Sequence, residues 1–194
     1  MPAFKDFLKK AKEVAEKGIE MVSEAMEFER LLKDFDEVVA STIAEILQEH
    51  GYRGLGQEES GGVYVLKMAV DDMDKVKPLV ERDMLRRYSP RDREKIVQVI
   101  PDIVEFRVSY TRRGQQVAVL MSPSHVEDVS VEAMLRYYVE KKGFLGRVSR
   151  DDHEVRLGRF SFKSSDYINY ETKEINREKL REYLETKLKT FGLI

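Results

Sequence analysis

The sequence predicts an α+β fold, in which a long N-terminal amphipathic helix or helical hairpin precedes a mixed or antiparallel sheet with flanking helices. Three observations predict this class. Apolar residues recur at steps of three and four through the first 47 positions. Runs rich in β-branched residues follow, as in strands. Helix start and stop signals lie between these runs. A ferredoxin-like β-α-β-β-α-β core is the specific arrangement that we expect.

The first segment, from Phe4 to Leu47, is predicted to be helical because its apolar residues form one stripe. A two-residue step from Met26 to Phe28 breaks the phase of that stripe. The step indicates either a rotation of the stripe along one helix or a bend near Ser23 between two helices. A helix of this length does not bury its stripe alone, so it must lie on the rest of the chain or on another copy. The stripe runs through positions 4, 8, 11, 15, 19, 22, 26, 28, 32, 35, 39, 43 and 46.

A glycine-rich loop is predicted to end this segment. The stretch "HGYRGLG" supplies a helix stop, and "QEESGG" extends the loop. We therefore expect two units, a helical oligomerisation or packing segment over 1–50 and an α+β domain over 51–194. The next run, Gly62–Val70, is predicted to be a buried strand. The carboxylates of "DDMD" then predict the start of a helix that continues to about Tyr88.

Further helices and a hairpin are predicted from local signals. Ser89, Pro90 and Asp92 form a capping box that starts a helix in "YSPRDREKIVQVI". "PDIVEFRVSYTRRGQQVAVLMSP" predicts a hairpin that turns at "RRGQ" and returns over Val117–Met121. Ser130 is expected to open a helix that Gly143 closes. Asn176 is expected to cap a terminal helix.

The segment "SRDDHEVRLGRFSFK" is predicted to be a second hairpin, with strands over 144–149 and 154–162 and its tip at Asp151–Glu154. Consecutive residues of a strand point to alternate faces, so at most two of these four side chains converge on a metal. Aspartate is common at turns, which favours the tip. A bulge at Gly158 would place four apolar residues on one face. The alternative interpretation is that "RFSF" forms a platform on which nucleic-acid bases stack.

Composition excludes several chemistries. The 34 basic and 36 acidic residues give a net charge of −2, which argues against a general polyanion-binding protein. The chain has no cysteine, so disulfides, thiolate metal sites and cysteine nucleophiles are excluded. No phosphate-binding loop, His-Glu-x-x-His motif or serine elbow occurs. We therefore expect no cofactor, no metal and no catalytic residues. No apolar run is long enough for a transmembrane segment, and a cytoplasmic location is expected.

The expected function is that of a non-enzymatic interaction or assembly protein. The N-terminal segment would form a coiled-coil homo-oligomer, because each large apolar side chain gains about 1.5–3 kcal/mol when it is removed from water. Other proteins are further expected partners. The residues expected to carry this association are Phe28, Leu32, Phe35, Val39, Ile43 and Ile46.

The alternative is a nucleic-acid-binding module with arginine-rich surfaces, and a hydrolase with dispersed acidic residues is a third hypothesis. Acidic residues interspersed among the arginines also favour a salt-bridged, solvated face. The expected nucleic-acid-binding residues are Arg82, Arg86, Arg87, Arg91, Arg93, Arg156, Arg159 and Lys163.

Overall fold

A computed structural model describes residues 2–110, 129–169 and 171–194. In the first helix the backbone is described throughout, whereas some of its side chains, including those of Phe28 and Leu32, lie outside the described set. The predicted return strand Val117–Met121 also lies outside the described residues.

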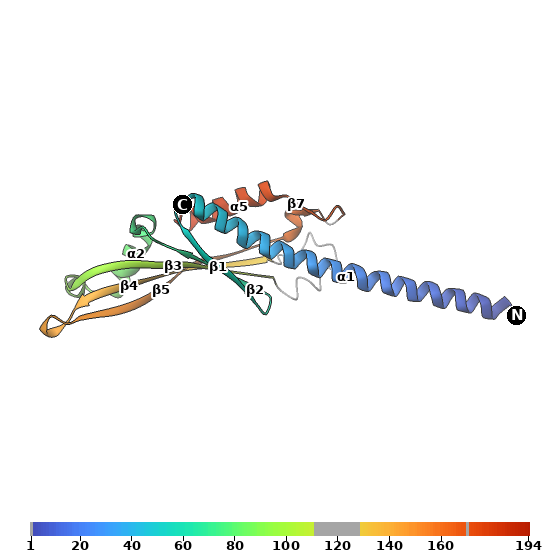
Figure 1. The fold of residues 1–194 in the computed structure, drawn as a ribbon, viewed down its shortest axis with the longest axis horizontal. Coiled ribbons are helices and arrows are strands. Elements are labelled where there is room, and N and C mark those ends of the chain that lie inside the picture. Colours follow the sequence, from blue (N-terminus) through green and yellow to red (C-terminus); the bar gives the residue numbers. More distant parts are fainter. Residues whose placement is uncertain (1, 111–128, 170) are drawn as a thin grey trace.

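The N-terminal segment is one continuous helix, α1 (Pro2–Glu49). Of the two alternatives that the sequence left open, one long helix is therefore correct. Its first half extends beyond the sheet, and its second half lies across the sheet (Figure 1). The helix stops where Gly51 takes a positive φ of 90°, and the Tyr52 amide donates to the Leu47 carbonyl at 3.0 Å.

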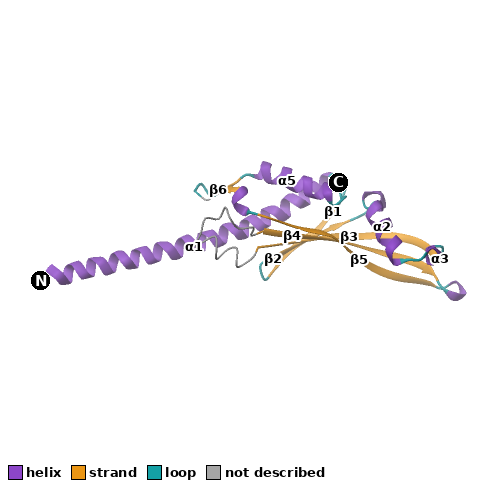
Figure 2. Cartoon of the chain, turned by 180° about the vertical axis from the view of Figure 1, so that it is seen from behind, coloured by secondary structure: helices purple, strands orange, loops and turns teal. Residues whose placement is uncertain are grey.

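A five-stranded sheet forms the centre of the molecule (Figure 2). Every neighbouring pair is antiparallel, and the strand order in space is the order in the chain. This confirms the α+β class with flanking helices. The ferredoxin-like arrangement is wrong, because each strand pairs with its neighbour in the sequence and no described strand crosses between two others. The strands are β1 (Arg53–Ser60), β2 (Val63–Ala69), β3 (Ile96–Tyr110), β4 (Val129–Lys142) and β5 (Val148–Phe162).

The shorter elements flank this sheet. Helix α2 (Lys77–Arg87) follows a 3₁₀ turn, η1 (Met73–Lys75), and α5 (Arg177–Thr190) closes the chain. A small ribbon of β6 (Ile168–Asn169) and β7 (Glu174–Ile175) precedes α5, after the 3₁₀ turn η4 (Ser164–Asp166). The Asn176 side chain accepts from the Lys179 amide at 3.1 Å, which confirms the predicted cap.

The helix predicted after Tyr88 is much shorter than expected. The Ser89 side chain accepts from the Asp92 amide, as the capping box predicts, but α3 (Pro90–Arg93) ends after one turn. Strand β3 begins at Ile96 because the β-branched run "IVQVI" pairs with β4 along its length.

The helix predicted over 130–143 is wrong, since this segment is strand β4. Its side chains alternate between buried and half-buried positions. The buried ones include Val131, Ala133, Leu135, Tyr137 and Val139. Pairing with β3 and β5 on both sides outweighs the helix propensity of its glutamate, methionine and leucine residues, because propensity differences are below about 1 kcal/mol per residue.

The predicted hairpin tip at Asp151–Glu154 is also wrong. Strand β5 is continuous through this segment, and the turn is the 3₁₀ element η3 (Phe144–Gly146), several residues earlier. The four polar residues pair with β4, with Asp152 opposite Tyr138 and His153 opposite Tyr137. A strand at the edge of the sheet accepts polar side chains, so their polarity did not indicate a turn.

The predicted loop after α1 contains the other edge strand, β1. All eight of its residues are exposed, so the strand carries no hydrophobic pattern that could reveal it. It is joined to β2 by Gly61 and Gly62, both with positive φ, as a type I′ hairpin turn requires.

The predicted bulge in β5 is confirmed. The register shifts beside Gly158, and Phe160 and Phe162 face the core, where they are buried. A Cβ atom on Gly158 would lie 2.6 Å from Cε1 of Phe191, so a ring packs directly on the backbone at the bulge. The two phenylalanines therefore cannot serve as a stacking platform for bases.

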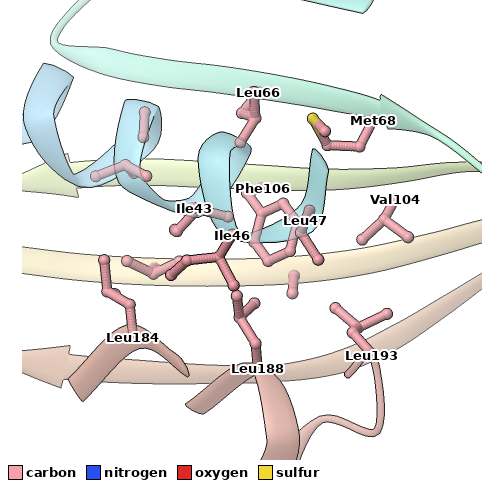
Figure 3. Close-up of a cluster of buried hydrophobic side chains, with 14 of the residues drawn as sticks. Ile43, Ile46, Leu47, Leu66, Met68, Val104, Phe106, Leu184, Leu188 and Leu193 are labelled. Carbon is pink, nitrogen blue, oxygen red and sulfur yellow. The ribbon is translucent and has the colours of Figure 1, made fainter. Parts of the chain in front are cut away.

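The core lies between one face of the sheet and the helices (Figure 3). Ile43, Ile46 and Leu47 of α1 meet Leu66 and Met68 of β2 and the side chains of β3. Leu184 and Leu188 of α5 close the cluster from the other side of α1. The second half of α1 is thus part of the core of the domain that follows it.

Candidate self-association surface

The second half of α1 is already covered by the chain itself. Phe35, Val39, Ile43 and Ile46 are each 0% exposed, packed against the sheet and α5. Phe28 and Leu32 lie on α1 with their side chains outside the described set. Four of the six residues expected to carry association therefore have their partners within one copy, and an interface between copies needs other residues.

The first half of α1 presents a different set of apolar side chains. Six large apolar side chains are between 51% and 69% exposed. Helices in proteins are stabilised mainly by packing of an apolar face, which these side chains lack within one copy. Large apolar side chains exposed along one helix are typical of an interaction site. We call this set the N-terminal apolar face; it consists of Phe4, Phe7, Leu8, Val14, Ile19 and Met26.

The N-terminal apolar face is wider than the predicted stripe. Phe7 lies 36 residues, or ten helical turns, before Ile43, and Val14 lies 25 residues, or about seven turns, before Val39, so both lie on nearly the same side of the helix as these buried residues. Leu8 and Ile19 extend the face sideways. Because α1 is continuous, the two-residue step from Met26 to Phe28 marks the expected rotation of the stripe around the helix axis and not a bend. A heptad reading of the sequence would have included Phe7 and Val14.

The charges around this face are unevenly distributed along the helix. Four lysines and one aspartate between Lys5 and Lys12 give this stretch a net charge of +3. Five glutamates and one lysine between Glu13 and Glu27 give the next stretch a net charge of −4. Lys12 and Glu16 form an exposed pair at 4.0 Å, worth only a few tenths of a kcal/mol. The two stretches are complementary in sign.

The arginines of α2 and α3 do not form one patch with those of β5. Arg82, Arg86 and Arg91 are exposed, and Arg93 is half-buried. Arg87 pairs with Asp83 at 2.6 Å, and its second nitrogen donates to the Glu154 carbonyl at 3.0 Å. Its charge is thus largely neutralised where α2 meets β5.

The basic residues of β5 lie on the sheet face opposite the core, among acidic partners. Arg156 pairs with Glu132 at 3.2 Å, and Arg159 donates to the Ser130 hydroxyl at 2.8 Å. Lys163 is half-buried where β5 ends. Beside them the buried Glu105 carboxylate binds Arg107 at 3.0 Å and Arg136 at 3.4 Å. This face is an ion-paired ladder, which offers few free cations to a phosphate backbone.

The polar residues of "DDHE" belong to a structural network under α2. The Tyr88 hydroxyl donates to Asp151 at 3.0 Å and also contacts Nε2 of His153. Lys141 binds the same Asp151 carboxylate at 2.7 Å, which lowers the pKa of that carboxyl. Burial lowers the pKa of His153 and raises that of Tyr88 to about 12.

Burial and the nearby Asp83 carboxylate raise the pKa of Tyr137, whose hydroxyl donates to Asp83 at 2.6 Å. With its pKa lowered, His153 is neutral at pH 7 and holds α2 on the sheet together with the two tyrosines.

Within the described residues, no group of three or more histidine and acidic side chains is arranged to hold a metal ion. Across the same residues, no helix is both long and apolar enough to cross a membrane. No protein-family model matches the chain, and searches of curated proteins and of solved structures also found no match.

Proposed function

We propose that this chain is a non-enzymatic assembly protein whose copies associate through the N-terminal apolar face of α1. The observation that carries the proposal is the exposure of six large apolar side chains on a helix that extends beyond its own sheet. Burial of one such side chain contributes about 1.5–3 kcal/mol, so several together favour association strongly.

A second copy of the chain is the proposed occupant because the charges of this segment complement themselves. In an antiparallel pair the +3 stretch of one helix lies beside the −4 stretch of the other. A parallel pair would place like charges side by side, which is unfavourable. The heptad spacing of Phe7 and Val14 suits a helix pair of this kind.

Light scattering on the full chain tests the proposal. We expect an oligomer for the wild-type chain and a smaller species for the double variant Leu8→Ser/Ile19→Ser. Both side chains are more than half exposed in a single copy, so their replacement leaves the core untouched.

The matched control is Lys9→Ser/Glu20→Ser. It changes the residues that directly follow Leu8 and Ile19, and it keeps the net charge. Both side chains are exposed, and the spacing places them on the other side of the helix. This control should remain oligomeric. A wild-type chain that scatters as a monomer of 22.7 kDa would refute self-association.

The orientation has a separate test, because the chain contains no cysteine of its own. Single Phe4→Cys and Met26→Cys chains should cross-link to each other when mixed and oxidised, because an antiparallel pair places these two exposed positions opposite each other, and Phe4→Cys alone should cross-link poorly. Efficient cross-linking of Phe4→Cys to itself would show a parallel pair.

A further inference from the structure

The turn between β4 and β5 exposes two large apolar side chains to solvent. Phe144 is 90% exposed and Leu145 is 81% exposed, the highest values among the large hydrophobic residues that the structure describes. The turn is compact, since the Gly143 amide donates to the Arg147 carbonyl at 2.6 Å. We call Gly143–Arg147 the hairpin tip. It lies at the opposite end of the molecule from the start of α1 (Figure 1).

The backbone of the hairpin tip holds these side chains outward at a conformational cost. Leu145 has φ of +64°, in the left-handed region that non-glycine residues rarely occupy. Glycines flank Phe144 and Leu145, yet a leucine occupies this strained position. Such strain concentrates at functional sites, where the side chain serves a purpose other than packing. Here neither side chain packs on the core, so folding does not account for them.

Basic residues flank Phe144 and Leu145 in the sequence. The sequence "KKGFLGRVSR" over 141–150 contains four basic residues and no acidic one. Lys141 and Arg150 are paired with Asp151 and Asp152, whereas Lys142 and Arg147 are exposed. The Lys142 amide donates to the Lys95 carbonyl at 2.9 Å, so the chain beside α3 adjoins the hairpin tip.

More basic residues lie at the same end of the molecule. Helix α3, which carries Arg91 and Arg93, lies near the hairpin tip (Figure 2). Asp92 and Glu94 offset the charges of these two arginines, so the exposed cations nearest to the apolar pair in the sequence are Lys142 and Arg147. Val148, also more than half exposed, extends the apolar surface along β5.

We propose that the hairpin tip docks onto an anionic lipid membrane, with Phe144 and Leu145 inserted at the boundary between headgroups and acyl chains. Apolar insertion and attraction of nearby cations to anionic headgroups act together at such a surface. A nucleic-acid backbone could bind the cations, but it offers no apolar region in which Phe144 and Leu145 could be buried. The proposal is independent of self-association, because it uses the other end of the molecule.

Sedimentation with lipid vesicles tests the proposal on the full chain. We expect binding to vesicles of equimolar phosphatidylserine and phosphatidylcholine, and much weaker binding to pure phosphatidylcholine. Phe144→Ser/Leu145→Ser should weaken binding by about tenfold or more, because it removes the inserted groups. Lys142→Gln/Arg147→Gln should weaken it and reduce its dependence on salt.

The matched control is Leu85→Ser, which removes another exposed apolar side chain, on α2, and should bind like the wild type. Circular dichroism verifies that each variant folds. Failure of the wild-type chain to bind the phosphatidylserine vesicles would overturn the proposal, as would equal binding by Phe144→Ser/Leu145→Ser. A duplex DNA probe that loses binding in that variant while vesicle binding persists would equally overturn it.

Discussion

The two halves of α1 use similar residues in opposite ways. Val14 and Ile19 in the first half are each 69% exposed, whereas Val39 and Ile43 in the second half are fully buried. One uninterrupted helix carries both pairs. The difference teaches that an apolar helix face predicts a partner without saying which one. In the second half the partner is the chain's own sheet, and for the first half we propose another copy.

The largest expected effect comes from one substitution made in both halves. Ile43→Ala leaves a cavity in the core and should lower the free energy of unfolding by about 2–5 kcal/mol. Ile19→Ala should leave the unfolding of the packed domain within about 0.5 kcal/mol of wild type, measured in urea at a concentration where the chain is monomeric. Equal losses for the two variants would show that the first half is also packed within one copy.

Glycine substitutions extend the comparison to the backbone. Gly158→Ala should destabilise the chain by about 1–3 kcal/mol, because its Cβ would meet the Phe191 ring at 2.6 Å and its φ is +155°. Gly18→Ala, in the first half of α1, meets nothing within 4 Å and should stabilise the helix by about 0.5–1 kcal/mol.

Gly56→Ala separates the two reasons why Gly158→Ala should destabilise the chain, the contact with Phe191 and the positive φ. It has a positive φ of 129° but open space around its Cβ, so it reports the cost of the backbone conformation alone. Thermal unfolding measures the Gly158 and Gly56 variants, and the helix content from circular dichroism measures the Gly18 variant. A Gly158→Ala chain no less stable than Gly56→Ala would contradict the close packing at the bulge.

The smallest expected effect depends on pH and concerns the packed domain alone. Burial, reinforced by the charge of Arg87, lowers the pKa of His153, so the folded chain favours the neutral ring. The unfolded chain binds a proton near the ordinary pKa of 6.5, so stability is fully present above that pH and declines as the pH falls below it.

His153→Gln should flatten this decline, as measured by urea unfolding at a series of pH values. The glutamine amide keeps a hydrogen-bond donor for Tyr88 but does not titrate. An unchanged slope in His153→Gln would assign the acid sensitivity to other groups.

Sequence reasoning found the elements whose signals are local. The cap at Asn176, the strand predicted over Gly62–Val70 and the bulge at Gly158 follow from residue type and alternation, and the structure has all three, with the strand over Val63–Ala69. Strand β4 was predicted as a helix although its alternation is regular, because its glutamate, methionine and leucine residues favour helices. Strand β1 had no signal, since all of its side chains are exposed.

The candidate surface was predicted only in part. The sequence indicated a long apolar helix face, but not that Phe35–Leu47 would find the sheet of the same chain. That outcome depends on where β2, β3 and α5 bring their apolar faces together, which is a property of the whole fold. The hairpin tip escaped detection because Phe144 and Leu145 resemble strand residues until the turn is located between Gly143 and Gly146.

The straightness of α1 sets a length scale for any assembly built from it. At 1.5 Å per residue, the stretch from Phe4 to Met26 measures about 35 Å. Two copies joined antiparallel along this stretch would hold their sheets at opposite ends of a rod, with the spacing fixed by the helix. The hairpin tips would then point outward from the two ends. If both proposals hold, such a particle would act as a molecular spacer between two separate surfaces.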